Sequence, residues 1–373
     1  MNKNVILIAG AIIAFTIGSG FATGQEIMQY YTAYGVNSIL VVLTFLILFM
    51  YYNFNFALAG VKEKFNKGND VFYYFCGKKI GVFFDYYSTV FCYMSFWVMI
   101  GGAASTLYQQ YGFQLWIGAV LLTILAAITV VGGLQRLLRI LGIIGPLIAV
   151  ICIIIGIITC FRDWGSFSSG LEAIKTGKLL GTTEGGIKSA GDNWFVSGFS
   201  YAGFVLLWFA SFMSQLGTKN KKEDLKKGII LGTIVICTAI IISCFAQIAN
   251  INTSINGGNQ YLWEADIPNL ILASKIWRPL STMFSVIIFA GIYTTAVPLL
   301  YNPVQRFSNE GTLKFKVMTL LLAIIGLIVG LKFPFRILLN IIYVINGYAG
   351  SVLILFIIAK NLKTLVKKED KHC

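Results

Sequence analysis

Ten long apolar stretches run through the sequence, and they constrain the fold more than any other feature. A bilayer core of about 30 Å is crossed by a helix of roughly 20 apolar residues. The stretches have this length and cover residues 4–32, 37–60, 82–109, 113–132, 136–160, 193–216, 227–250, 275–304, 313–332 and 335–361. Only 12% of the residues are charged, against about 25% in a typical soluble domain. We therefore predict one all-helical membrane domain over residues 1–373 and exclude a soluble enzyme, a disordered chain and a secreted disulfide scaffold.

The positions of the basic residues predict the orientation. The chain has 29 Lys and Arg residues and a formal net charge of +14. With a cytoplasmic N-terminus, 21 of the 29 fall in cytoplasmic segments, and the outer turns near 33–37 and 109–113 contain none. Cytoplasmic loops of membrane proteins carry such an excess of Lys and Arg. We therefore predict that both termini are cytoplasmic. The positive charge follows from membrane topology, and nucleic acid is not an expected partner.

Catalytic and redox motifs are missing from the sequence. None of the seven cysteines forms a CxxC pair, and the only histidine, His372, lies in the charged C-terminal tail. The apolar stretches contain no HExxH motif and no convincing pair of carboxylates. These observations predict that the chain is not an enzyme and needs no cofactor.

Glycines interrupt the first apolar stretch at membrane depth. Three of them, Gly18, Gly20 and Gly24, fall within seven residues, and each costs about 1 kcal/mol relative to alanine inside a helix. Non-helical backbone at this depth survives only where it lines a cavity enclosed by protein. Close helix packing through small residues is the alternative, but it does not explain the carboxylate of Glu26, two residues after Gly24. We therefore predict a broken helix near 18–24.

The sixth stretch carries a similar interruption, with two glycines, two serines and a tyrosine inside an apolar run. It opens the second half of the chain, about 193–362, as the first stretch opens the first half, about 4–160. Each half has an odd number of spans, so the halves are inverted with respect to each other. Breaks at matching places in inverted halves mark the midplane site of secondary transporters. We predict a break near 198–203 beside the one near 18–24.

Two adjacent threonines in the eighth stretch, Thr294 and Thr295, bring hydroxyl oxygens to membrane depth. Pro298 has no N–H for the carbonyl of Thr294, which therefore loses its helical partner. Hydroxyl and carbonyl oxygens are hard ligands that suit a small cation. Threonine hydroxyls also commonly bond to carbonyls of their own helix. This stretch alone does not decide between a cation site and an ordinary helix.

Two long polar connections, about 161–192 and 251–274, are predicted on the outer side. The second contains the apolar segment 267–272, in which Pro268 stands in the first turn of a predicted short helix. This helix either lies across the mouth of the protein or is a plain connector.

The sequence GSGFATGQE at 18–26 resembles the signature of the YkvI-like bacterial membrane proteins, transporter-like members of the amino acid–polyamine–cation superfamily. FAG at 289–291 followed by TT at 294–295 is similar to the span-8 sodium motif of the neurotransmitter:sodium symporters. The resemblance implies a LeuT-type fold in a bacterial plasma membrane. That fold has ten transmembrane helices in a 5+5 inverted repeat, with helices 1 and 6 broken.

The resemblance also implies sodium as the coupling ion, held between spans 1 and 8. Its ligands would be the carbonyls of Ala14, Ile17 and Ala290 and the hydroxyl of Thr294, with Thr295 beside them. Tyr293 departs from the pattern, because a small hydroxyl residue would stand there. Proton-coupled relatives can carry a span-5 lysine in place of sodium. Residues 140–159 contain no charged residue, which favours sodium.

These features together predict a cation-coupled secondary transporter that moves an amino acid, an amine or a similar small solute by alternating access. The predicted substrate site lies between spans 1 and 6 and contains Gly18, Ser19, Gly20, Phe21, Thr23, Glu26, Phe199, Ser200, Tyr201 and Phe204, with Tyr93 and Phe96 from span 3. Simple packing is the alternative for the two span-3 aromatics. The expected partners are a small-molecule substrate and the lipid bilayer, and the oligomeric state is left open. The alternative function is a membrane sensor on a transporter scaffold.

Glu26 is the ionisable residue of greatest interest, because a carboxylate within a membrane span is costly. Three roles fit it: pairing with a cationic substrate, carrying the coupled proton, or capping the freed amides of its own half-helix. Asp85, near the inner end of span 3, is predicted to form a salt bridge with a nearby Lys or Arg.

Overall fold

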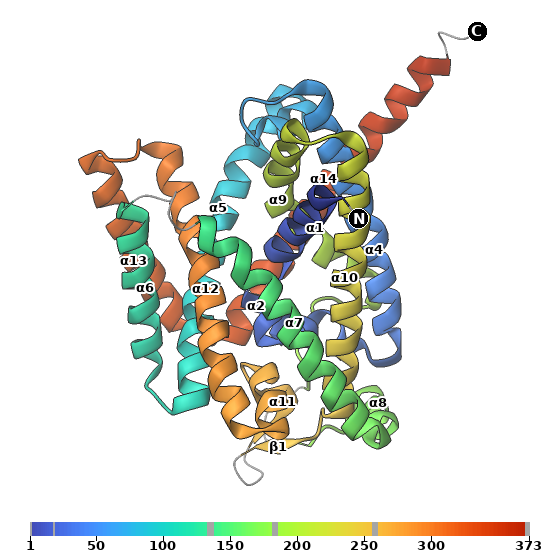
Figure 1. Ribbon diagram of the computed structural model, residues 1–373, viewed down its shortest axis with the longest axis vertical. Helices are drawn as coiled ribbons and strands as arrows, with labels where there is room; N and C mark the ends of the chain where they lie inside the picture. The colour runs from blue at the N-terminus through green and yellow to red at the C-terminus, as the bar shows by residue number, and fades with distance from the viewer. Residues whose placement is uncertain (1, 18, 133–137, 181–185, 256–259, 370–373) are drawn as a thin grey trace.

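The computed structural model describes residues 2–17, 19–132, 138–180, 186–255 and 260–369 as a nearly all-helical bundle (Figure 1). Within these residues, nine helices are long and apolar enough to cross a membrane. They are α4 (Ser38–Glu63), α5 (Asp70–Tyr111), α6 (Leu115–Gly132), α7 (Leu138–Asp163), α9 (Trp194–Lys219), α10 (Lys222–Ala249), α12 (Arg278–Phe307), α13 (Leu313–Lys332) and α14 (Phe335–Glu369). In chain order they correspond to the predicted spans 2–10, so the predicted helical fold class is confirmed.

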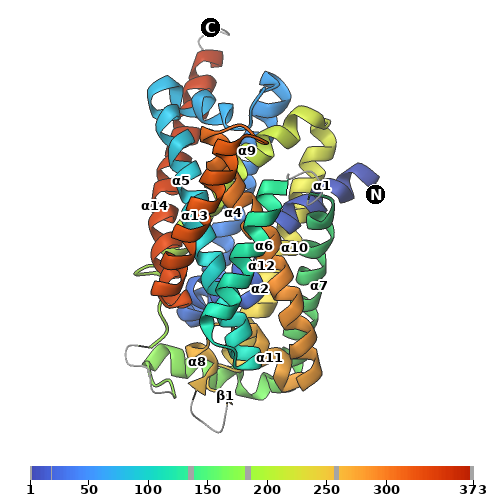
Figure 2. The ribbon, with the colours of Figure 1, turned by 90° about the vertical axis from the view of Figure 1, so that its left-hand side faces the viewer.

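The first predicted span is divided into three short helices, α1 (Lys3–Thr16), α2 (Ser19–Thr23) and α3 (Gln25–Tyr30). Helix α1 lies obliquely to its neighbours, and its N-terminal end projects from the bundle (Figure 2). The break predicted near 18–24 is therefore confirmed. Gly18 and the side chain of Ser19, two predicted site residues, lie outside the described part of the chain.

Two connections build one end of the molecule, which we call the α11 face. The first contains a 3-10 turn (Trp164–Ser166) and α8 (Phe167–Thr176), and the second contains strands β1 (Ser254–Ile255) and β2 (Gln260–Tyr261), another 3-10 turn (Leu262–Glu264) and α11 (Pro268–Ile276). The two strands pair antiparallel, with Ser254 opposite Tyr261. Figures 1 and 2 place α8, α11 and β1 at the end opposite the C-terminus. The predicted short helix is confirmed, with Pro268 at its start.

The helices pack in two groups. One contains α1, α4, α9 and α10, in which α4 lies along α9 and α1 along α10. The other contains α5, α6, α12 and α13, in which α5 lies along both α6 and α12, while α7 and α14 contact both groups. The first group holds spans 1, 2, 6 and 7 and the second holds spans 3, 4, 8 and 9. Each group therefore takes matching spans from both halves. The repeat limits of about 4–160 and 193–362 stay a prediction.

Helix α9 is continuous, so the break predicted in span 6 near 198–203 is wrong. Its glycines serve close packing instead. A Cβ on Gly198 would lie 2.8 Å from the Cβ of Thr44 in α4, and a Cβ on Gly203 would collide with the carbonyl oxygen of Gly347 in α14. Small residues let helix backbones approach this closely. The interruption in the sequence thus marks the contact of α9 with two neighbours.

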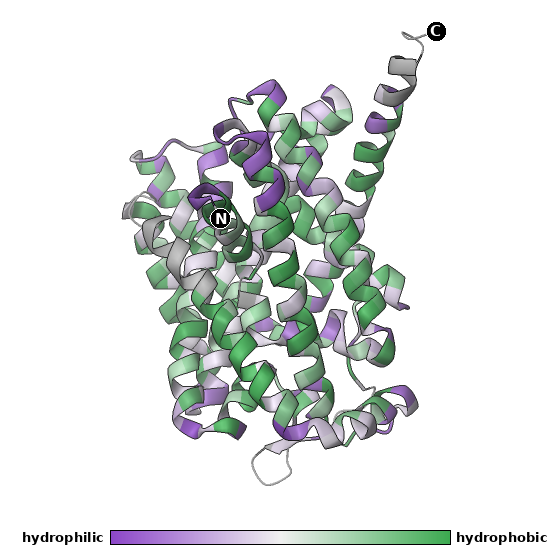
Figure 3. Cartoon of the chain, turned by 45° about the vertical axis from the view of Figure 1, so that its right-hand side comes forward, coloured by the Kyte–Doolittle hydropathy of each residue, from purple (hydrophilic) through white to green (hydrophobic). Residues whose placement is uncertain are grey.

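The surface pattern fits a bilayer. Hydrophobic residues cover the helices between the two ends of the molecule, and hydrophilic residues gather at the ends (Figure 3). On the outside of the bundle, Ile47, Ile128 and Ile328 are each more than 60% exposed. Extended apolar surface of this kind is not left facing water, so these helices face lipid. The chain is a multi-pass membrane protein.

Candidate functional site

The break in the first span lies between the end of α1 and Gly24. Ile17 follows α1 with φ −83° and ψ 71°, outside the helical region. Gly24 joins α2 to α3 with φ +84°, a conformation that glycine adopts without a steric penalty. Thr23 donates to the carbonyl of Gly20 over 2.8 Å and accepts from the backbone N–H of Gln25 over 3.3 Å. Its hydroxyl therefore links α2 to α3.

Glu26 places a buried carboxyl group at this break. It lies in the first turn of α3 and is only 4% exposed. Its side chain folds back over Gly20, where a Cβ would collide with Oε1 of Glu26. Its Oε2 accepts a hydrogen bond of 3.1 Å from the hydroxyl of Tyr201 in α9. The structure thus brings together three predicted site residues, and the missing side chain of Gly20 provides the space for the carboxyl group.

Aromatic rings surround Tyr201. Four ring centroids lie 4.9–5.2 Å from its own, those of Tyr30, Tyr31, Phe45 and Phe204. All four meet it edge to face, a favourable geometry for aromatic pairs. Sequence reasoning predicted Phe204 but missed the two tyrosines, whose only signal is their spacing of four and five residues after Glu26.

A second group of rings continues from Phe204 toward α5 and α14. Tyr343 of α14 stacks on Phe204 with centroids 4.7 Å apart, and Trp208 lies 5.6 Å from Tyr343. Phe91 of α5 stacks on Trp208 at 5.4 Å. Sequence reasoning missed these three residues, because a single aromatic residue inside an apolar run gives no sign of its partners.

Phe199 and Ser200 pack against α14. The hydroxyl of Ser200 lies 3.5 Å from the carbonyl oxygen of Val344, and the carbonyl of Phe199 accepts a hydrogen bond of 3.2 Å from Ser351. Both had been predicted as substrate contacts on an unwound segment. On the regular helix that is present, both residues therefore contact α14, and their role as substrate contacts stays a prediction.

Tyr93 and Phe96 contact α13. The hydroxyl of Tyr93 donates to the carbonyl of Leu322 over 2.8 Å. The ring of Phe96 lies where a Cβ on Gly326 would be only 2.8 Å from its Cε1. These contacts agree with the packing alternative, and a substrate contact of either residue stays a prediction.

The predicted sodium ligands lie on α1 and α12. Ala14 and Ile17 stand at the C-terminal end of α1, where the last carbonyls have no helical partner and the helix dipole favours a cation. In α12, the hydroxyls of Thr294 and Thr295 donate to the carbonyl of Gly291 over 2.9 and 3.0 Å. Each hydroxyl keeps lone pairs that can coordinate a cation.

Two other residues of the predicted sodium motif, Ala290 and Tyr293, lie near these threonines in α12. Ala290 is half-buried in α12. Tyr293 turns to α6, where its hydroxyl lies 2.6 Å from that of Thr129. Its side chain therefore does not fill the space beside Thr294 and Thr295. Helix α12 packs against α2, which follows α1 in the chain. The sodium site stays a prediction.

Amide side chains from distant helices bind the carbonyls of the break. Asn269 of α11 donates to the carbonyls of Phe21 and Ala22 over 3.4 and 3.1 Å. Gln247 of α10 donates to the carbonyl of Gly24 over 2.8 Å. Buried backbone carbonyls need such partners, so these amides stabilise the break. Phe21, predicted as part of the apolar wall, is fully buried.

Asp266 holds the α11 face closed over the break. Its Oδ2 accepts a hydrogen bond of 2.7 Å from Ser105 in α5, and its Oδ1 lies 3.4 Å from Nε of Arg336 in α14. Gln25 donates to the carbonyl of Ala265 over 2.9 Å. Burial raises the pKa of Asp266, while Ser105 and Arg336 act in the opposite direction. These contacts fix the loop before α11 against α3, α5 and α14.

Acidification is expected to stabilise this closure. Opening would hydrate Asp266 and return its pKa toward the usual range, so the closed arrangement binds the proton more tightly. Stability of the closure therefore rises as the pH falls through the raised pKa. A cysteine introduced at Ala265, which is fully buried, should react more slowly with a water-soluble maleimide at lower pH, relative to a cysteine at the exposed Ser169. Faster relative labelling at low pH would contradict this expectation.

Asp85 forms a buried ion pair toward the opposite end of the molecule. It is 2% exposed, and its Oδ2 lies 2.5 Å from a guanidinium nitrogen of Arg306 in α12. Asn69 and Tyr73 donate to its two oxygens over 2.6 and 2.9 Å. The predicted salt bridge is confirmed, and it joins two helices of the same group.

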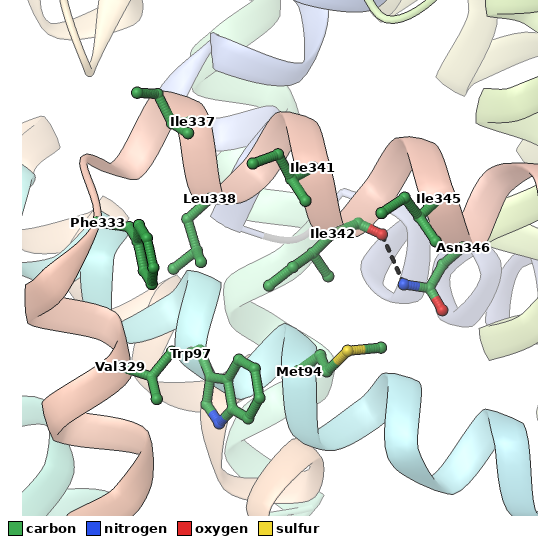
Figure 4. A pocket seen from close by; sticks show the side chains of 10 residues that line it. All are labelled: Met94, Trp97, Val329, Phe333, Ile337, Leu338, Ile341, Ile342, Ile345 and Asn346. Carbon is green, nitrogen blue, oxygen red and sulfur yellow. Dashed lines mark hydrogen bonds between the residues drawn. The ribbon is translucent and has the colours of Figure 1, made fainter.

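A cavity of about 250 Å³ lies apart from these residues, between α5, α13 and α14 (Figure 4). Its lining is apolar except for Trp97 and Asn346, and the Nδ2 of Asn346 donates to the carbonyl of Ile342 over 2.6 Å. Ile341 and Ile345, which also line it, are 49% and 57% exposed, so the cavity opens toward lipid. It contains none of the predicted site residues.

Comparison with solved structures identifies the fold. MhsT in complex with L-phenylalanine has a TM-score of 0.63 at 15% identity, over 95% of this chain and 88% of that chain. This chain has the LeuT-type transporter fold. A manganese transporter of Eremococcus coleocola, in complex with an aromatic bis-isothiourea substituted compound, has a TM-score of 0.56 at 12% identity over 94% of this chain and 76% of that chain. Mhp1 in its inward-facing conformation has a TM-score of 0.54 at 13% identity, covering 94% and 75%.

Sequence comparisons add no family. No protein-family model matches this chain, and no curated protein sequence matches it. The predicted LeuT-type fold is thus confirmed by structural likeness, whereas the resemblance to the YkvI-like proteins is not confirmed.

Proposed function

We propose that this protein is a secondary transporter that moves a small organic solute with an amino group across a bacterial plasma membrane by alternating access. The observation that carries the proposal is the buried carboxyl group of Glu26 at a break in a membrane span, seated on Gly20 and bonded to Tyr201. An ionisable group within a membrane span is a mark of function, and interrupted helices mark transporter sites. MhsT, which shares the fold, was solved with L-phenylalanine.

A metal ion as substrate has less support. The manganese transporter shares the fold, but in the described part of this chain no group of three or more His, Cys, Asp and Glu side chains could hold a metal ion. Protein sites for divalent metals are built from several such ligands. One carboxyl group among aromatic rings suits an organic solute better.

The two groups of helices offer a route for alternating access. Tyr201 and the broken span belong to the group of α1, α4, α9 and α10, which faces the group of α5, α6, α12 and α13 across the site. At the α11 face, Asp266 pairs with Arg336 over 3.4 Å, and this contact would have to open for a solute to reach Glu26 from that end. If one group rocks against the other, the α11 face would open while the opposite end of the molecule closes. The distribution of basic residues favours cytoplasmic termini, with the α11 face outside.

Sodium is the coupling ion that we propose, and Thr294→Ala tests it. The substitution removes one oxygen ligand from a hard cation but no backbone hydrogen bond from the helix. The sodium concentration for half-maximal uptake into proteoliposomes should rise about tenfold or more, equivalent to about 1.4 kcal/mol. Thr319→Ala is the matched control, because Thr319 is a buried threonine of α13 whose hydroxyl donates to the carbonyl of Phe315 over 2.8 Å. It should leave the sodium dependence unchanged.

The solute for this assay comes from a thermal-shift screen of amino acids and amines, with and without sodium. Uptake that ignores sodium and follows a pH gradient would show that sodium coupling is wrong, and Glu26 would then be the leading proton carrier. Binding without concentrative uptake under either gradient would favour a membrane sensor on a transporter scaffold.

A further inference from the structure

The break in span 1 holds an acidic side chain of the protein itself. The first turn of a helix favours anions, because its backbone N–H groups have no helical partner. In this chain Glu26 occupies the first turn of α3, and its carboxyl group folds back over Gly20. A side chain of the protein therefore fills the space beside the glycine that a substrate carboxylate would need.

The carboxyl group of Glu26 can also accept further hydrogen bonds at the break. The backbone carbonyls there already accept hydrogen bonds from Asn269 at 3.1 Å and from Gln247 at 2.8 Å. Glu26 accepts from Tyr201 at 3.1 Å, whereas a carboxylate offers about four lone-pair sites. No ion pair within the described part of the chain includes Glu26. A buried carboxylate without a cation is costly, so a cationic ligand would supply its missing partner.

The surrounding side chains suit an organic cation. Tyr30, Tyr31 and Tyr343 are fully buried, and the rings of Tyr30 and Tyr31 lie 4.9 and 5.2 Å from the ring of Tyr201, which donates to Glu26. Tyrosine rings attract ammonium groups through their faces, and their hydroxyl groups can both donate and accept hydrogen bonds. A zwitterionic amino acid would bring a second carboxylate toward Glu26, and like charges in a buried site repel each other.

We propose that the site binds an organic amine cation that lacks a carboxylate, with Glu26 as the partner of its ammonium group. This inference rests on the proposed function, since it specifies the substrate class of the same site. Glu26 takes the position at the broken helix that the carboxylate of an amino acid would otherwise occupy. The protein would thus select against amino acids by like-charge repulsion and select for the corresponding amines.

Matched ligand series test the substrate class on the full-length protein without any substitution. The first series is 2-phenylethylamine, L-phenylalanine and 3-phenylpropanoate, and the second is 3-methylbutylamine, L-leucine and 4-methylpentanoate. Within a series the side group is constant and only the charged groups differ. Affinities are measured by isothermal titration in sodium-containing buffer. At least one amine should bind about tenfold or more tightly than its amino acid, and neither carboxylate should bind.

The outcomes separate this inference from the proposed function. Equal or tighter binding of the amino acids, or no binding of either amine, would overturn the inference, and sodium-driven uptake of an amino acid would then leave the transporter proposal standing. Selective binding of an amine without uptake into proteoliposomes would support the inference while the transporter proposal fails.

Discussion

Glu26→Gln is expected to reduce the affinity for an amine cation by about two to four orders of magnitude, equivalent to about 3–5 kcal/mol. The amide keeps the size of the side chain and can still accept the hydrogen bond from Tyr201, which is 3.1 Å long in the native protein. It removes the negative charge, so the ammonium group of the ligand would be buried without a partner. Isothermal titration of the purified variant with the amine that the wild-type protein binds gives the measurement.

Two further variants make this result interpretable. Gly20→Ala keeps the charge but places a Cβ where Oε1 of Glu26 now lies, so it should also weaken binding by displacing the carboxyl group. Asp163→Asn removes a carboxylate that pairs with Lys275 at 3.0 Å, near the α11 face. It should leave the affinity unchanged.

The other roles of Glu26 predict different outcomes. If Glu26 only caps its half-helix, the Gln variant would lose about 0.3–1 kcal/mol of dipole interaction and would bind and accumulate solute almost normally. If Glu26 carries the coupled proton, binding would survive while concentrative uptake fails. Near-normal affinity therefore argues against a substrate ion pair, and the uptake assay then separates the two remaining roles.

Gly203→Ala is expected to destabilise the fold by at least about 1–3 kcal/mol, the usual cost of overpacking. The added Cβ would collide with the carbonyl oxygen of Gly347 and lie 2.8 Å from the backbone nitrogen of Ser351. Both are backbone atoms of α14, so they cannot move aside as a flexible side chain could. The midpoint of thermal unfolding in detergent should fall clearly below that of the native protein.

Gly10→Ala is the matched control for this substitution. Gly10 also lies inside an apolar helix, α1, but a Cβ there would meet no atom within 4 Å. Alanine is about 1 kcal/mol more favourable than glycine within a helix, so the thermal midpoint should stay the same or rise. Equal midpoints for the two variants would show that the contact between α9 and α14 tolerates a methyl group and is looser than the structure indicates.

The sequence by itself determined the features that depend on local chemistry. The apolar stretches indicated the number and order of the spans, because an apolar stretch of about 20 residues crosses the bilayer as a helix that satisfies its own backbone hydrogen bonds. The glycines at 18–24 predicted the broken helix, since Gly24 adopts a left-handed conformation. Pro268 predicted the start of α11. Each of these signals acts within a few residues of its own position, so no knowledge of the rest of the chain was needed.

The tertiary structure alone decided which residues share a neighbourhood. The sequence around Gly203 predicted an unwound segment, whereas in the structure Gly203 forms a close contact with α14. A glycine can permit either an unwound backbone or close helix packing, and only the neighbouring helix shows which of the two applies. Asn269 and Gln247 reach the break from helices more than 200 residues away in sequence. Tyr201 meets Glu26 across 175 positions. Packing between distant segments determines such partners. The sequence around a single side chain in an apolar run does not indicate which residues will contact it.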